Sequence, residues 1–146
     1  MRYIVLSLLL LLTFFKALAS DHRAYYHYML GETYLMDDEY ESAISEYVKA
    51  SVYDSSSAYI RVKIANAYMQ MGNMEFALYN VKRGLELDPE NTEALVLYSD
   101  ILLMNDDLER AEKTCSAVLE IEPDNRNAIQ CKVSALIGMK EYKKAL

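Results

Sequence analysis

The sequence has 146 residues, a formal net charge of −7 at pH 7 and 53% hydrophobic residues, with only four Gly, two Pro and two Cys. This length suits one domain, and the shortage of Gly and Pro argues against a strand-rich sandwich or barrel, which needs many turns. The acidic balance argues against a nucleic-acid-binding protein, and two Cys are too few for a disulfide-framework mini-protein. The composition therefore indicates an acidic, mostly helical domain.

Residues 1–19 have the features of a secretory signal peptide. Arg2 precedes an apolar stretch at 3–15, and Ala17 and Ala19 stand at the two specificity positions of a cleavage site. The alternative is an uncleaved membrane anchor, but as a helix this stretch would span about 20 Å, less than the ~30 Å hydrocarbon core. We therefore expect cleavage after Ala19 and export to the periplasm or outside the cell, with a membrane-tethered form as the alternative.

Cleavage after Ala19 would remove Arg2 and Lys16 and none of the 22 acidic residues, which leaves the mature chain with a net charge of −9. This charge disfavours anionic membrane surfaces. We expect no membrane insertion after cleavage, and no nucleic-acid partner.

A period of 34 residues runs through residues 20–146, the predicted folded domain. Several independent series of residue types keep this spacing, which chance would not produce. The series are Ala43, Ala77, Ala111 and Ala145; Tyr34, Tyr68, Leu102 and Leu136; Tyr40, Met74, Leu108 and Tyr142; and Leu30, Ile64 and Tyr98. We place the units at residues 24–57, 58–91, 92–125 and 126–146, the last of them incomplete.

Each unit is predicted to form two helices joined by a tight turn. In the first unit one helical stripe runs through residues 27–34 and a second through residues 40–50. Asp38 with Glu41 matches a helix-capping box at this turn, and so does Asp106 with Glu109 two units later. Gly72-Asn73 marks the same turn in the second unit.

The loops after the second helices also repeat. Pro89 and Pro123, which cannot continue a helix, stand in the loops of the second and third units, and Ser55 replaces Pro in the first. Small residues at Gly31, Ala65 and Ser99 allow neighbouring helices to approach closely.

This pattern resembles the tetratricopeptide repeat (TPR) family, although the usual Trp of the first helix is replaced by His27, Arg61, Leu95 and Ile129. The resemblance implies an all-α solenoid of antiparallel helix pairs, with about three and a half repeats in a right-handed superhelix. It also implies a protein that binds another protein and catalyses no reaction. No polar capping helix follows the fourth unit, so we expect more repeats or a further domain downstream. The alternative is a true C-terminus with a frayed last helix.

The sequence contains no catalytic, cofactor-binding or metal-binding pattern, so we expect no enzyme, no cofactor and no metal. His22 and His27 lie five residues apart, off a common helix face, and His27 falls in the core register. No phosphate-binding Gly-rich loop or calcium loop is found. Cys115 and Cys131 fall on helices expected to pack side by side, so a disulfide and two small core residues both remain open.

In TPR arrays the first helices line a concave groove, and the resemblance places the candidate binding residues there. They are Tyr25, Tyr28, Glu32, Tyr59, Val62, Asn66, Gln70, Glu93, Val96 and Asp100, beside Leu35, Met36, Met69, Leu103 and Met104. Leu35, Met69 and Leu103 fit burial under neighbouring helices equally well. The Tyr side chains offer rigid apolar area with a hydroxyl, and Asn66 offers both a donor and an acceptor to a peptide backbone.

The groove is expected to be acidic, because it contains Glu32, Glu93 and Asp100 and almost no basic residue. We therefore expect the partner to be a neutral or basic, partly apolar protein segment, and not an acidic tail. The sequence favours an exported scaffold in the assembly of an envelope complex. The alternative is the TPR portion of a larger enzyme or sensor whose active domain follows residue 146.

Overall fold

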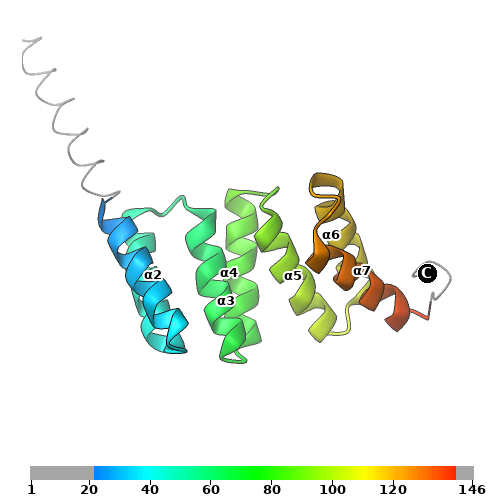
Figure 1. Cartoon of the computed structure of the whole chain (residues 1–146), viewed down its shortest axis with the longest axis horizontal. Helices are drawn as coiled ribbons and strands as arrows, with labels where there is room; N and C mark the ends of the chain where they lie inside the picture. Colours follow the sequence, from blue (N-terminus) through cyan, green and yellow to red (C-terminus); the bar gives the residue numbers. More distant parts are fainter. Residues whose placement is uncertain (1–21, 141–146) are drawn as a thin grey trace, which may run out of the picture.

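The computed structural model describes residues 22–140, and within this range all regular secondary structure is helical. A helical segment at 22–36 is followed by α2 (Tyr40–Tyr53), α3 (Ala58–Gln70), α4 (Met74–Leu87), α5 (Thr92–Met104), α6 (Leu108–Ile121) and α7 (Arg126–Gly138). The helices stack side by side into an elongated array (Figure 1). The predicted signal peptide at 1–19, and Tyr142 and Ala145 in the fourth unit, lie outside the described residues.

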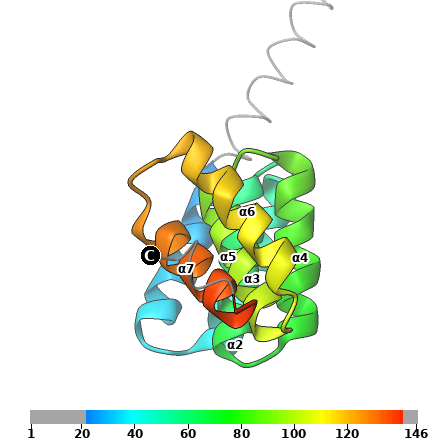
Figure 2. The same ribbon diagram turned by 90° about the vertical axis from the view of Figure 1, so that its right-hand side faces the viewer.

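The helices form two layers. The first helices of the pairs are in mutual contact, because α5 packs on both α3 and α7. In addition, α3 packs on α4 and α5 packs on α6, the second helix of the same pair. Viewed along the array, α7 and α4 lie on opposite sides, in the layers of first and second helices (Figure 2). The closer approach of the first helices makes their layer the inner, concave side. No helix within residues 22–140 is long and apolar enough to cross a membrane.

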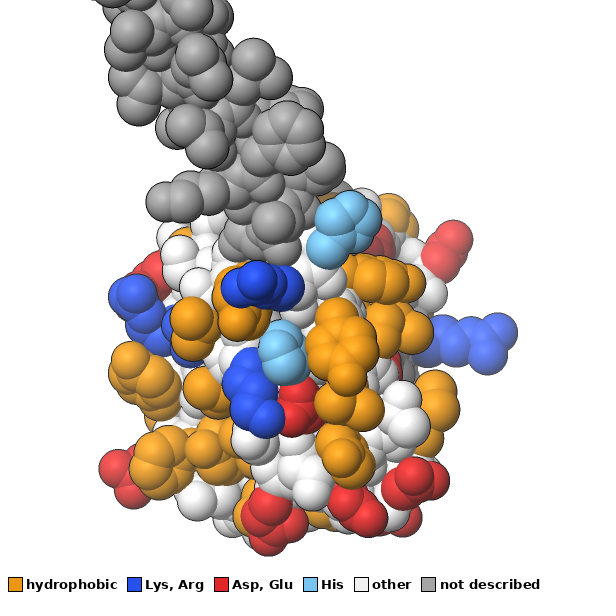
Figure 3. Space-filling view, turned by 90° about the vertical axis from the view of Figure 1, so that its left-hand side faces the viewer, with side chains coloured by type: hydrophobic (Ala, Val, Ile, Leu, Met, Phe, Trp, Pro, Cys, Tyr) orange, Lys and Arg blue, Asp and Glu red, His pale blue; other side chains and the backbone are white. Residues whose placement is uncertain are grey.

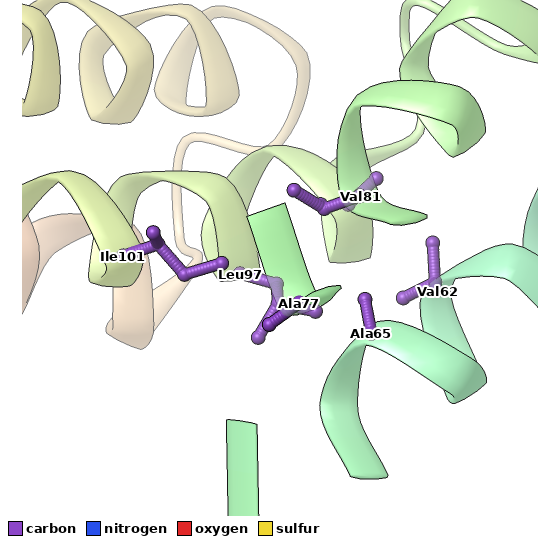
Figure 4. Close-up of a cluster of buried hydrophobic side chains, with 7 residues drawn as sticks. Val62, Ala65, Ala77, Val81, Leu97 and Ile101 are labelled. Atoms are coloured by element: carbon purple, nitrogen blue, oxygen red, sulfur yellow. The ribbon is translucent and has the colours of Figure 1, made fainter. Parts of the chain in front are cut away.

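The repeated small residues form the core, as predicted. Ala43, Ala77 and Ala111 are completely buried. At the centre of the array, Ala77 and Val81 of α4 pack against α3 and α5 (Figure 4). Burial of such apolar surface contributes about 25 cal/mol per Å², so stacking on the next pair adds to the stability of each pair.

One residue in each intra-pair turn has a left-handed backbone. Asp38, Gly72, Asp106 and Lys140, spaced by 34 residues, have φ values of 58°, 74°, 59° and 61°. This conformation lets the chain reverse while its amides bond the last carbonyls of the preceding helix, as Gly72 N does to Met69 O at 2.9 Å.

The left-handed turn makes the two predicted capping boxes wrong by one residue. Asp38 and Asp106 supply the turn, and the N-caps are Glu39 for α2 and Asp107 for α6. Asp107 accepts from the backbone N of Arg110, whereas Glu39 makes no side-chain cap. The sequence pattern located the turn correctly, but it predicted Asp38 and Asp106 to be N-caps, whereas both adopt the left-handed backbone of the turn.

A disulfide joins Cys115 of α6 to Cys131 of α7, with their Cα atoms 6.2 Å apart. Of the two interpretations that the sequence left open, the covalent one is therefore the one in the structure. The bond crosses between the third pair and the first helix of the fourth.

Candidate protein-binding groove

Three tyrosines form a pocket at one end of the concave layer. Tyr25 and Tyr28 reach it from the segment at 22–36 and Tyr59 reaches it from α3, with Ser57 in the connecting loop. The hydroxyl oxygens of Tyr28 and Tyr59 lie 3.2 Å apart. Tyr25 is 64% exposed and Tyr59 42% exposed, so apolar ring surface and a hydrogen-bonding hydroxyl are open to a ligand.

A charged cluster occupies the middle of the groove. Lys63 Nζ of α3 lies 3.8 Å from Glu32 Oε1 and 3.6 Å from Glu93 Oε1, and 4.9 Å from the centre of the Tyr59 ring. The Tyr47 hydroxyl of α2 donates to Glu32 Oε1 at 2.5 Å. The Glu32 carboxylate therefore contacts the Tyr47 hydroxyl of its own helix pair and the Lys63 ammonium of the next pair.

Burial and charge act together on these groups. Burial lowers the pKa of the Lys63 ammonium, but the Tyr59 hydrogen bond and the charges of Glu93 and Glu32 outweigh it, so its pKa is raised. Burial, then the bond to Glu32, raises the pKa of the Tyr47 hydroxyl. Lys63 therefore stays charged and is already neutralised by its own chain.

Lys63 is the groove residue that sequence reasoning missed, and Val62 is the one wrongly placed there. Val62 is only 1% exposed and packs in the central core (Figure 4). Lys63 follows Tyr59 by four residues and precedes Asn66 by three, which is the spacing of one helix face. That spacing could have identified it. Val96 is only partly exposed.

A second pocket lies between the far ends of the first two inner helices. It is lined by Leu35, Asn66 and Gln70 together with Asp38 and Tyr40 of the turn. Gln70 Nε2 donates to Asn66 Oδ1 at 3.5 Å, a long bond that a ligand amide can replace.

The predicted apolar stripe divides into covered and exposed members. Leu35, Met69 and Leu103 pack against core clusters, whereas Met36 and Met104 are 83% and 64% exposed. These three are partly buried, and Leu35 and Leu103 also line pockets of the concave layer.

A third pocket lies between α5 and α7. It is lined by Asp100, Leu103, Asn127, Gln130, Cys131 and Ser134. Burial raises the pKa of the Asp100 carboxyl. Glu93, two turns earlier on α5, belongs to the central charged cluster instead.

His27 packs on α2, away from the tyrosine pocket and the charged cluster. His27 Nδ1 is 2.7 Å from Glu46 Oε2, and its ring stacks on Tyr53. The end of the array carries histidine among basic, acidic and apolar side chains (Figure 3). Within residues 22–140 no group of three or more His, Cys, Asp or Glu is arranged to hold a metal ion.

This architecture of stacked helix pairs is the tetratricopeptide-repeat fold, and the predicted all-α solenoid is confirmed. Residues 75–136 match a family model described as tetratricopeptide repeat. The first TPR of Spaghetti (RPAP3), solved bound to the HSP90 peptide SRMEEVD, is similar with a TM-score of 0.79 and 22% identity, over 82% of this chain and 95% of that one.

Two curated proteins also match parts of the chain. Tetratricopeptide repeat protein 21A of Mus musculus is 26% identical over 96 residues, which are 66% of this chain and 7% of the relative. DnaJ homolog subfamily C member 3 of Gallus gallus is 30% identical over 83 residues, 57% of this chain and 16% of the relative. The chain thus spans a small part of the length of these relatives.

Proposed function

We propose that this protein is an exported, non-catalytic scaffold that holds an extended segment of another protein along its concave layer, in the assembly of an envelope complex. The observation that carries the proposal is the exposed tyrosine pocket of Tyr25, Tyr28 and Tyr59. Exposed aromatic side chains are among those most enriched in binding surfaces. The peptide-bound RPAP3 domain provides a precedent for ligand binding by this fold.

The charges of the groove favour a neutral or basic segment. The RPAP3 peptide is acidic, and such a ligand needs unpaired cations. Here the groove cation Lys63 lies between Glu32 and Glu93, so an acidic ligand would meet carboxylates first. Apolar ligand side chains fit the tyrosine pocket, and the amides of Asn66 and Gln70 suit a peptide backbone.

The disulfide supports the export part of the proposal. Disulfides persist in oxidising compartments and are rare in the cytosol. Cys115 and Cys131 are paired, and the N-terminal pattern at 1–19 is that of a cleaved export signal. Intact mass measurement of the protein recovered from the envelope fraction tests this, because cleavage after Ala19 gives a mass that an uncleaved anchor does not.

The binding surface is tested by a triple variant, Tyr28→Ala, Tyr59→Ala and Asn66→Ala, used as bait in an affinity pull-down from envelope extract. We expect the partners captured by the wild-type protein to be lost while the helical circular dichroism is unchanged. The matched control is Tyr79→Ala, because Tyr79 is 59% exposed on α4 in the outer layer. If both variants capture the same partners as the wild type, the concave layer is not the binding surface.

A further inference from the structure

Equivalent positions on two inner helices carry the carboxylates of Glu32 and Asp100, and in the part of the chain that the structure describes only Glu32 has hydrogen-bond and ion-pair partners. Glu32, Asn66 and Asp100 lie 34 residues apart, so they occupy equivalent places along the concave layer. Glu32 is bonded to Tyr47 and paired with Lys63. Within residues 22–140 Asp100 has neither a hydrogen-bond partner nor an ion pair, although it is only partly exposed.

The repeat explains why Asp100 has no partner. The residue equivalent to Tyr47, two units on, is Cys115, and the residue equivalent to Lys63 is Cys131. These two are joined in the disulfide, which supplies neither an O–H donor nor a positive charge. The disulfide therefore replaces both groups that hold Glu32.

The middle unit shows that a charge is not required at this position. There the equivalents of Tyr47 and Lys63 are Val81 and Leu97, both buried, and the polar residue beside them is the neutral Asn66. A charge in an apolar setting costs desolvation, which is seen in the raised pKa of the Asp100 carboxyl. The Asp100 carboxyl lines a pocket whose other polar walls are two amides and a hydroxyl, at Asn127, Gln130 and Ser134.

We propose that the pocket between α5 and α7 binds an arginine side chain of the partner segment. The guanidinium of this arginine would pair with the Asp100 carboxylate as the Lys63 ammonium pairs with Glu32. A guanidinium presents five donors in a planar fork, which suits a carboxylate flanked by amide oxygens and a hydroxyl. Leu103 offers apolar surface to the aliphatic stem. This assignment rests on the proposed function, and it states where on the groove a basic residue of the partner would bind.

The test uses a single-residue probe, N-acetyl-arginine methylamide, titrated into the ¹⁵N-labelled protein and followed by NMR. We expect saturable shifts of the amide signals of residues lining the pocket, among them Gln130 and Ser134. N-acetyl-citrulline methylamide, which has the same shape without the charge, should leave these signals unmoved. Because charge-assisted hydrogen bonds are the stronger kind, Asp100→Asn should weaken arginine-probe binding by about tenfold or more.

The matched control is Glu109→Gln, which removes the same charge from an exposed position on α6, outside the pocket and outside the groove. We expect it to bind the arginine probe as the wild type does. Equal binding by Asp100→Asn and Glu109→Gln, equal response to arginine and citrulline, or no shift at α5 and α7 would each overturn the assignment. The probe contains no partner protein, so this result is independent of the pull-down that tests the scaffold function.

Discussion

The ring of Tyr47 lies so close to the Cα of Gly31 that a β carbon at residue 31 would lie 2.6 Å from Cε1 of that ring. Tyr47 is completely buried and its hydroxyl is bonded to Glu32, so the ring has no free direction in which to move. We expect Gly31→Ala to lower the free energy of unfolding by about 1–3 kcal/mol through overpacking, measured by thermal or urea unfolding.

The control for this substitution is Gly84→Ala in α4, where the nearest atom to a new β carbon is 3.4 Å away. Alanine is the better helix former by roughly 1 kcal/mol, which offsets the tighter contact, so Gly84→Ala should be close to neutral. Equal destabilisation at both positions would show that helix geometry, and not the Tyr47 ring, sets the requirement at Gly31.

The disulfide is expected to contribute strongly to stability. It closes a loop with a sequence separation of 16 residues, which in the chain-entropy treatment stabilises the folded state by about 3 kcal/mol. Cys115→Ala with Cys131→Ala should lower the urea midpoint accordingly. Adding a reductant should shift the wild-type midpoint in the same direction and leave the double variant unchanged. Identical midpoints for oxidised and reduced protein would contradict this expectation.

The hydrogen bonds of Glu46 with Lys49 and His27 should make the free energy of unfolding fall in acid. The hydrogen bond from Lys49, opposed by burial and assisted by His27, lowers the pKa of the Glu46 carboxyl below its ordinary value of 4.5. The folded state therefore binds the proton less readily than the unfolded state, and this contribution is complete above pH 4.5 and disappears as the pH falls through the folded-state pKa.

We expect Glu46→Gln to lower the free energy of unfolding by about 1.5 kcal/mol at pH 7, because charge-assisted bonds are lost. The difference between variant and wild type should shrink below pH 4, measured by urea unfolding across a pH series. A difference that does not vary with pH would mean that Glu46 stabilises through packing alone.

The left-handed turns predict one stabilising substitution. Asp106 has a φ of 59°, which costs a side-chain-bearing residue more than it costs glycine. Asp106→Gly should raise the free energy of unfolding by about 0.5–1 kcal/mol in thermal unfolding, since its equivalent in the second unit is already Gly72. The reverse change, Gly72→Ala, should be destabilising by about 1 kcal/mol. The same sign of effect at both positions would refute the shared turn geometry.

The 34-residue period predicted the fold well because every unit of the solenoid packs its helices in the same way. The small residues at Ala43, Ala77 and Ala111 define the pair interface directly, so spacing alone located the core. The exposed face was harder to predict, because Val62 and Lys63 differ by one helical step of 100° and only the packing of α3 between α4 and α5 decides which is covered.

Contacts between units could be predicted only in part from residue types. The sequence left the disulfide of Cys115 with Cys131 as one of two possibilities, and it gave no sign of the pairing of Glu32 with Lys63, because both depend on side-chain directions across neighbouring pairs. Asp100 was expected on the groove, but its isolation follows only from knowing that Cys131 occupies the place of a lysine. The residues that differ between equivalent positions of the units therefore determine which ligands each pocket can bind, and the repeat pattern alone does not.

Three inner helices, α3, α5 and α7, also carry their own start signals. Ser57, Asn91 and Asn125 stand one residue before α3, α5 and α7, and each accepts a hydrogen bond from the backbone N three residues on. Because these signals are local, a gene that gains or loses 34 codons keeps every remaining helix in register. The array can therefore lengthen or shorten by whole units, and pockets such as those at Tyr59 and Asp100 can change their separation without any change in their own construction.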